Sequence, residues 1–196
     1  MNLANKLTLI RIFLVPVFLL FIATKDIPYG SFIATFIFIL ASITDKLDGY
    51  VARSRNQITN FGKFMDPLAD KLLVTTALIS LVELHVVPAW AVVVIIAREF
   101  AVSGLRSIAA SQGRVIAASW WGKIKTVIQI IAIILLLLKV NIHDSAYLKH
   151  FVADNYYLKE FFVTVPTIML MVAVIITLIS GYDYFKKNKE AVSIDN

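Results

Sequence analysis

The chain has 196 residues, of which 59% are hydrophobic and 16% charged, and its mean hydropathy is +0.81. Soluble domains carry about 25% charged residues, so this composition indicates an integral membrane protein. Cysteine is absent, which excludes disulfides and thiolate metal sites. The net charge of +6 is expected of a membrane protein with basic cytosolic edges, and we expect no nucleic-acid partner.

Apolar runs along the chain predict six transmembrane helices. In chain order they span roughly Thr8–Thr24, Ser31–Arg53, Asp66–Glu83, Ala89–Ala110, Thr126–Lys139 and Phe161–Tyr182. The first run follows Lys6 and Arg11 as in a signal peptide, but no clear small-residue cleavage site follows it, so we expect it to remain a helix. The predicted fold class is all-α, a membrane bundle of six helices that forms a single domain over residues 1–196.

Polar segments predict the connections between these helices. The segment 54–62, SRNQITNFG, predicts a loop that ends at Gly62. The residues ELHVVP predict a tight turn, in which His85 is a solvated residue rather than a ligand. The segment 111–126 contains Arg114, Lys123 and Lys125 and has the composition of a positive cytosolic loop. The polar and aromatic segment 141–160 predicts an external loop with an interfacial stretch.

Six helices place both termini on one side of the membrane. Of the 19 Lys and Arg residues, all but four would lie on that side, which leaves about 15 there; the four are Lys25, Lys139, Lys149 and Lys159. The positive-inside rule then predicts that both termini and the segment 45–70 face the cytosol.

The segment 45–70 contains four aspartates, at positions 45, 48, 66 and 70. Asp45 and Asp48 are three residues apart and Asp66 and Asp70 four apart, so each pair is expected on one helix face. A carboxylate at a bilayer centre costs about 2.5 to 3.5 kcal/mol, so four of them need a cation. Convergent carboxylates without nearby His or Cys favour Mg²⁺, Mn²⁺ or Ca²⁺ over zinc.

Three of the four aspartates, and Gly49, also have a simpler interpretation. Asp66 precedes Pro67, which is the pattern of a helix N-cap followed by proline at the first helical position. Asp45 and Asp48 would otherwise be interfacial residues paired with Lys46 or Arg53. Gly49 would otherwise be a small residue at a helix contact, rather than room for a phosphate group.

The spacing of the whole segment favours one site. It reads D-x2-D-G-x2-A-R-x8-G-x3-D-x3-D, and its fixed positions are filled by Asp45, Asp48, Gly49, Ala52, Arg53, Gly62, Asp66 and Asp70. This pattern resembles the complete signature of the CDP-alcohol phosphotransferase family, with no position departing from it. The resemblance implies a bacterial plasma-membrane enzyme that releases CMP from a CDP-activated lipid, and a homodimer, because relatives form one.

The resemblance also implies roles for individual residues. The four aspartates would bind one or two Mg²⁺ or Mn²⁺ ions bridged to the diphosphate, and Asp70 would also be the general base for the acceptor hydroxyl. Residues expected near the nucleotide are Gly49, Ala52, Arg53 and Gly62. Asn5 and Thr8 are expected to help hold the nucleotide, with a helix N-cap role as their alternative.

The acceptor is expected to be bound by basic groups further along the chain. An anionic acceptor needs cations, and five lie in segments that can border the cytosolic cavity: Arg98, Arg106, Arg114, Lys123 and Lys125. Arg98 and Glu99 are adjacent and do not share a helix face, so a simple pair within the helix explains them poorly. The stretch 97–126 resembles the family branch whose acceptor is glycerol 3-phosphate.

The expected reaction is therefore phosphatidyl transfer from CDP-diacylglycerol to glycerol 3-phosphate, among membrane lipids. One alternative is the same chemistry with inositol phosphate or serine as the acceptor. Another is an ion transporter in which the aspartates form the pathway; that would place them at the membrane midplane, whereas the long second helix places them at its edge. Residues after about 130 carry little beyond hydrophobicity, and we infer nothing specific from them.

Overall fold

The computed structural model describes residues 3–24, 26–54, 60–111, 116–117 and 119–188. Within these residues all regular structure is helical, which confirms the predicted all-α class. The helices are α1 (Leu3–Ala23), α2 (Gly30–Ser54), α3 (Asn60–Glu83), α4 (Ala89–Ser111), α5 (Trp120–Asp144), α6 (Ala146–Asp154) and α7 (Tyr156–Lys187).

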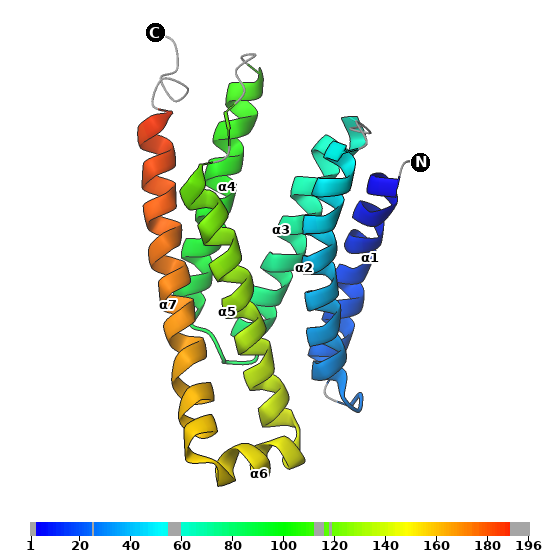
Figure 1. Cartoon of the computed structure of the whole chain (residues 1–196), viewed down its shortest axis with the longest axis vertical. Helices are drawn as coiled ribbons and strands as arrows, with labels where there is room; N and C mark the ends of the chain where they lie inside the picture. Colours follow the sequence, from blue (N-terminus) through cyan, green and yellow to red (C-terminus); the bar gives the residue numbers. More distant parts are fainter. Residues whose placement is uncertain (1–2, 25, 55–59, 112–115, 118, 189–196) are drawn as a thin grey trace.

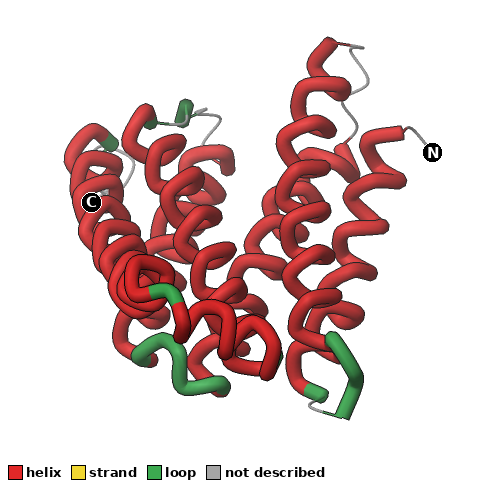
Figure 2. The backbone as a smooth tube through the Cα atoms, turned by 60° about the horizontal axis from the view of Figure 1, so that its bottom comes forward, coloured by secondary structure: helices red, strands yellow, loops and turns green. Residues whose placement is uncertain are grey.

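Six long helices run along one axis and alternate in direction, while the short α6 lies across one end (Figure 1). α1, α2 and α3 pack together, α5 and α4 pack on α7, and contacts of α2 with α5 and of α3 with α4 join the two groups. The start of α1, the end of α2, the start of α3 and the end of α7 therefore lie at the same end of the bundle. The connections after α1 and α3 lie at the other end, with α6 (Figure 1 and Figure 2).

Large apolar side chains fill the centre of the bundle and also cover its outside. Phe18 of α1 and Phe38 of α2 are fully buried, with ring centroids 6.2 Å apart. Exposed large side chains include Phe13, Phe36 and Leu178, as expected where a helix faces lipid. Among the described residues, α5 and α7 are long and apolar enough to cross a membrane, and α1 and α2 contain shorter apolar stretches, Thr8–Ala23 and Gly30–Thr44.

Several helices extend beyond the apolar runs that predicted them. α3 begins at Asn60, so the predicted loop over 54–62 is wrong for its last residues, and Gly62 lies inside the helix. Because Asp66 lies six residues after the first residue of α3, its interpretation as an N-cap is also wrong. The predicted loop over 111–126 is likewise wrong at its end, since α5 begins at Trp120.

Local hydrogen bonds explain where two of these helices begin. The Ser119 side chain accepts a hydrogen bond from the Gly122 amide at 3.1 Å, which caps α5. Asn155 caps α7 by accepting from the amides of Tyr157 and Leu158. The predicted loop over 141–160 is wrong for most of its length, because α5 runs to Asp144, α6 covers nine residues and α7 begins at Tyr156.

The predicted turn after α3 is confirmed. His85 is exposed there, in a left-handed backbone conformation with φ of 58°. At the same end, Gly30 begins α2 so close to α1 that a Cβ at this position would lie 2.7 Å from the carbonyl oxygen of Phe21. Only glycine allows this approach of the two helices.

Candidate functional site

The motif aspartates lie on two helices that run in opposite directions. Asp45 and Asp48 are in the last ten residues of α2, and Asp66 and Asp70 are in the first half of α3. The end of α2 and the start of α3 meet at one end of the bundle, so the backbone brings both pairs to that end (Figure 1). The side chains of all four lie outside the described residues, as do those of Asn5, Ala52 and Arg53 and the whole of Arg114, while Gly49 and Gly62 are described only as part of α2 and α3.

α1 contributes polar side chains to the inside of the same end. Thr8 is 1% exposed and Arg11 is 2% exposed, and Arg11 is among the largest fully buried side chains described. Both are engaged in polar interactions. Asn5 and Thr8 lie inside α1 rather than at its start, so the N-cap alternative is wrong for both.

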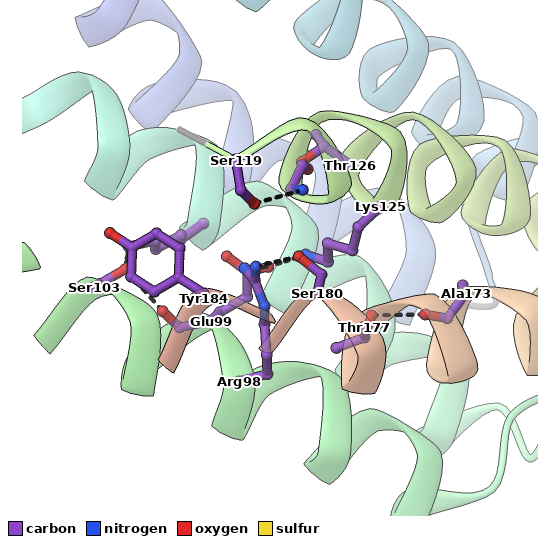
Figure 3. Close-up of polar contacts among 12 residues, drawn as sticks. Arg98, Glu99, Ser103, Ser119, Lys125, Thr126, Ala173, Thr177, Ser180 and Tyr184 are labelled. Atoms are coloured by element: carbon purple, nitrogen blue, oxygen red, sulfur yellow. Dashed lines mark hydrogen bonds and ion pairs between the residues drawn. The ribbon is translucent and has the colours of Figure 1, made fainter. Parts of the chain in front are cut away.

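Charged side chains of α4 and α5 meet between the helices (Figure 3). The Lys125 ammonium donates to the Glu99 carboxylate and forms an ion pair with it. Glu99 Oε1 also lies 3.7 Å from Arg98 Nη1, so these adjacent residues do form an ion pair. The closer partner of Glu99 is nevertheless Lys125, on α5. Lys125 is buried and Lys123 exposed, because residues two apart point to opposite sides of a helix.

A polar path connects this cluster to α3. Lys71, the residue after Asp70, donates to the hydroxyl of Ser103, which donates to the Glu99 carbonyl oxygen at 2.7 Å. A cavity of about 30 Å³ lies beside this path and is lined by Lys71, Val74, Thr75, Glu99, Lys125, Thr126, Gln129 and Ile130. The cavity is large enough for about one water molecule.

Gln129 was not anticipated from the sequence, although it lies one turn after Lys125. Its side chain is 3% exposed and lines that cavity, and its Oε1 has no hydrogen-bond partner in the described part of the chain. A buried acceptor of this kind is where a polar group of a ligand or a water would bind.

α7 supplies two further residues that sequence reasoning missed. Arg98 Nη2 donates to Ser180 Oγ at 2.6 Å, and Arg106 Nε donates to the Tyr184 hydroxyl at 2.9 Å. The Arg106 guanidinium also lies 5.5 Å from the centre of the Tyr184 ring. Polar residues spaced three or four apart in an otherwise apolar helix were the available signal.

A larger cavity, of about 700 Å³, lies at the end of the bundle opposite the motif. Its lining includes Glu83, His85, Lys139, His143 and Asp144, and no motif residue. The lining has both charges, positive at Lys139 and negative at Glu83 and Asp144, and His143 Nδ1 lies 3.6 Å from Asp144 Oδ1. Among the residues described, no group of three or more His, Asp or Glu is arranged to hold a metal ion.

Comparison with known proteins identifies the family. The family model described as CDP-alcohol phosphatidyltransferase matches residues 1–179. The CDP-diacylglycerol–glycerol-3-phosphate 3-phosphatidyltransferase of Bacillus subtilis is 45% identical over 206 residues, covering 100% of this chain and 99% of its own.

Two further relatives are similar to this chain over most of its length. The protein of the same name from Rickettsia bellii is 38% identical, over 96% of each chain. A probable phosphatidylglycerophosphate synthase of Mycobacterium tuberculosis is 39% identical over 93% of this chain and 79% of its own. With its complete aspartate motif on two helices at one end of an all-helical bundle, the chain belongs to the CDP-alcohol phosphatidyltransferase family.

Proposed function

We propose that this protein transfers the phosphatidyl group from CDP-diacylglycerol to glycerol 3-phosphate, which gives phosphatidylglycerophosphate and CMP. One observation carries the proposal: the complete motif occurs in a chain that aligns end to end, at 45% identity, with a relative named for this reaction. The backbone of α2 and α3, which brings the four aspartates to one end of the bundle, supports it.

The four aspartates are proposed to hold one or two Mg²⁺ or Mn²⁺ ions, since carboxylate oxygens are the donors these ions prefer. When bound, the metal would neutralise the diphosphate and the charge that develops on its oxygens. Asp70 accepts the proton of the acceptor hydroxyl, whose oxygen attacks the phosphorus that bears the diacylglycerol. The bond from that phosphorus to the bridging oxygen breaks, and CMP leaves with the electron pair.

The nucleotide is proposed to lie between α1, α2 and the start of α3. Thr8 supports this, because it is buried on the inner side of α1 at the motif end of the bundle. The small residues of α2 would let the diphosphate approach the helix. The full set proposed for nucleotide and CDP-lipid binding is Asn5, Thr8, Gly49, Ala52, Arg53 and Gly62.

The acceptor phosphate is proposed to bind on α4, the connection to α5 and the first turns of α5. The set is Arg98, Arg106, Arg114, Lys123 and Lys125. Its described members differ in their partners: Lys125 is paired directly with Glu99, Arg98 donates to a hydroxyl and lies 3.7 Å from Glu99, and Arg106 donates to a hydroxyl. A phosphate dianion is attracted most by cations whose charge is least offset by a carboxylate. Arg98 and Arg106 are therefore the leading candidates.

The same proposal includes six membrane-spanning helices, a cytosolic active site, cytosolic termini and a homodimer in the bacterial plasma membrane. Supporting it are the alternating directions of the six long helices and the apolar lengths of α5 and α7. The excess of Lys and Arg at the motif end also supports it.

The direct test is CMP release by purified protein from CDP-diacylglycerol in mixed micelles with Mg²⁺. Glycerol 3-phosphate, inositol phosphate and serine are compared as acceptors. Asp70→Asn should abolish release, and Asp154→Asn, in the exposed end of α6, is the matched control that should not. Release supported only by another acceptor would overturn the choice of glycerol 3-phosphate. No release with any acceptor, together with ion flux in liposomes, would favour the transporter alternative.

A further inference from the structure

The inner face of α7 near its end is built from a hydroxyl, a glycine and a tyrosine, at Ser180, Gly181 and Tyr184. We call these three residues the α7 face. Ser180 and Tyr184 are four residues apart and therefore adjacent on the helix, and they are 0% and 1% exposed. The rest of α7 is strongly apolar, so a buried polar face here needs a partner.

The partners are two arginines of α4 (Figure 3 shows Arg98 beside Ser180). Arg98 and Arg106 are eight residues apart on α4. Ser180 accepts a hydrogen bond from Arg98 at 2.6 Å, and Tyr184 accepts one from Arg106 at 2.9 Å. The Tyr184 ring lies under the Arg106 guanidinium, in cation–π geometry.

Gly181 explains how Arg98 lies so close to α7. A Cβ at Gly181 would be 3.2 Å from Arg98 Cγ, which is tighter than ordinary van der Waals contact. The glycine therefore leaves room for the stem of Arg98 to lie against the helix backbone. A Cβ at this position would require the Arg98 stem to move by a few tenths of an ångström, and we expect the guanidinium to move with it.

The chemistry of the α7 face preserves the charge of both arginines. A hydroxyl oxygen accepts a hydrogen bond without adding negative charge, in contrast to Glu99, which is paired with Lys125 and lies 3.7 Å from Arg98 Nη1. Arg98 keeps further N–H groups: its side chain is 12% exposed, and its buried Nε has no hydrogen-bond partner in the described part of the chain. A guanidinium held this way is ready to donate to a phosphate.

We propose that Ser180, Gly181 and Tyr184 are positioning residues, which orient Arg98 and Arg106 toward the phosphate of the acceptor. An arginine side chain loses rotamer entropy when it is ordered. Ordering it before the ligand arrives removes part of that loss from binding. The inference rests on the proposed function, and it assigns the end of α7 to the acceptor half of the site.

Three variants test the positioning role: Ser180→Ala, Gly181→Ala and Tyr184→Phe. Each should raise the KM for glycerol 3-phosphate by about 3- to 10-fold, a change that corresponds to the net contribution of one ordinary hydrogen bond. The KM for CDP-diacylglycerol and the kcat should stay within about twofold. The inhibition constant of inorganic phosphate, measured against glycerol 3-phosphate, should rise by a similar factor.

The same helix supplies matched controls. Thr177→Val removes a buried hydroxyl that donates to the Ala173 carbonyl oxygen within α7 and contacts neither arginine. Tyr182→Phe removes the hydroxyl of an exposed tyrosine. Neither should change the KM for glycerol 3-phosphate. An unchanged KM for glycerol 3-phosphate in both Ser180→Ala and Tyr184→Phe would overturn the inference. Parallel increases in the KM for glycerol 3-phosphate and the KM for CDP-diacylglycerol would also overturn it, whether or not the control variants show the same increases.

The wild-type assay separates this inference from the proposed function. If wild-type CMP release depends on inositol phosphate instead, the acceptor proposal fails while the same KM comparison tests the α7 face with that acceptor. If release depends on serine, which has no phosphate, inhibition by inorganic phosphate provides the test. Phosphate inhibition that is absent or equal in wild type and variants would then overturn the positioning role.

Discussion

The ion pair between Glu99 and Lys125 offers a quantitative test of how α4 and α5 are joined. The Lys125 side chain is 4% exposed and that of Glu99 22% exposed, so both charges are largely withdrawn from water. Glu99→Gln keeps the shape and the acceptor oxygen but removes the negative charge. Lys125→Met removes the ammonium, and the double variant removes both charges together.

The expected magnitude follows from the burial of the pair. Removing one partner of a buried pair costs about 3 to 5 kcal/mol, and partial exposure of Glu99 places each single variant near about 3 kcal/mol. For a chain of 196 residues this corresponds to a Tm lower by about 6 to 12 °C, at about 2 to 4 °C per kcal/mol. The double variant should lose at least about 1 kcal/mol less than the sum of the singles.

Stability is measured as the Tm of purified protein in detergent, by the loss of the monodisperse chromatographic peak after heating. Turnover is the wrong measurement here, because Lys125 is also a proposed acceptor ligand. If the stability loss of the double variant equals the sum of the two single losses within about 0.5 kcal/mol, the reasoning is refuted, because additive losses mean that the two charges do not interact.

Three further outcomes are expected. Chelation of divalent ions should abolish CMP release, and Mg²⁺ or Mn²⁺ should restore it; full activity in excess chelator would contradict the metal proposal. Gly30→Ala, whose Cβ would lie 2.7 Å from the Phe21 carbonyl oxygen, should lower stability by about 1 to 3 kcal/mol. Gly104→Ala, with nothing within 4 Å of its Cβ, should raise it by about 0.5 to 1 kcal/mol, and the reverse order of the two Tm changes would refute the packing argument. Asn141→Leu removes the 3.1 Å hydrogen bond to buried Thr35 between α5 and α2, and should cost about 1 kcal/mol; an unchanged Tm would contradict this.

Hydropathy predicted which segments are helical but not where the helices end. Apolar runs report the solvent around a helix, whereas the backbone remains helical into water as long as its hydrogen bonds are made. α3 illustrates this, since its first three residues, Asn60, Phe61 and Gly62, fall in the segment that the sequence predicts as a loop. α7 is 32 residues long although its apolar run predicted only Phe161–Tyr182.

The motif was readable because its residues are close in the sequence and on predictable helices. The contact between Arg98 and Ser180 joins residues 82 apart, and no local pattern specifies which helices pack together. The polar positions of α7 were visible in the sequence, but their partners depend on the packing of α7 against α4. The sequence also gave no sign that Lys125 and Glu99, on different helices, form a pair.

The length of α7 has a consequence for how the reaction is measured. At 1.5 Å per residue its 32 residues extend about 48 Å, well beyond a hydrocarbon core of about 30 Å, and its last turn carries Lys186 and Lys187. Under the proposed function, the acceptor arrives from water beside that protruding end, while the donor diffuses within the plane of the bilayer. The two substrates therefore have different concentration scales, one in moles per litre and one as a mole fraction of lipid. Adding inert detergent at constant bulk donor should slow turnover by surface dilution alone.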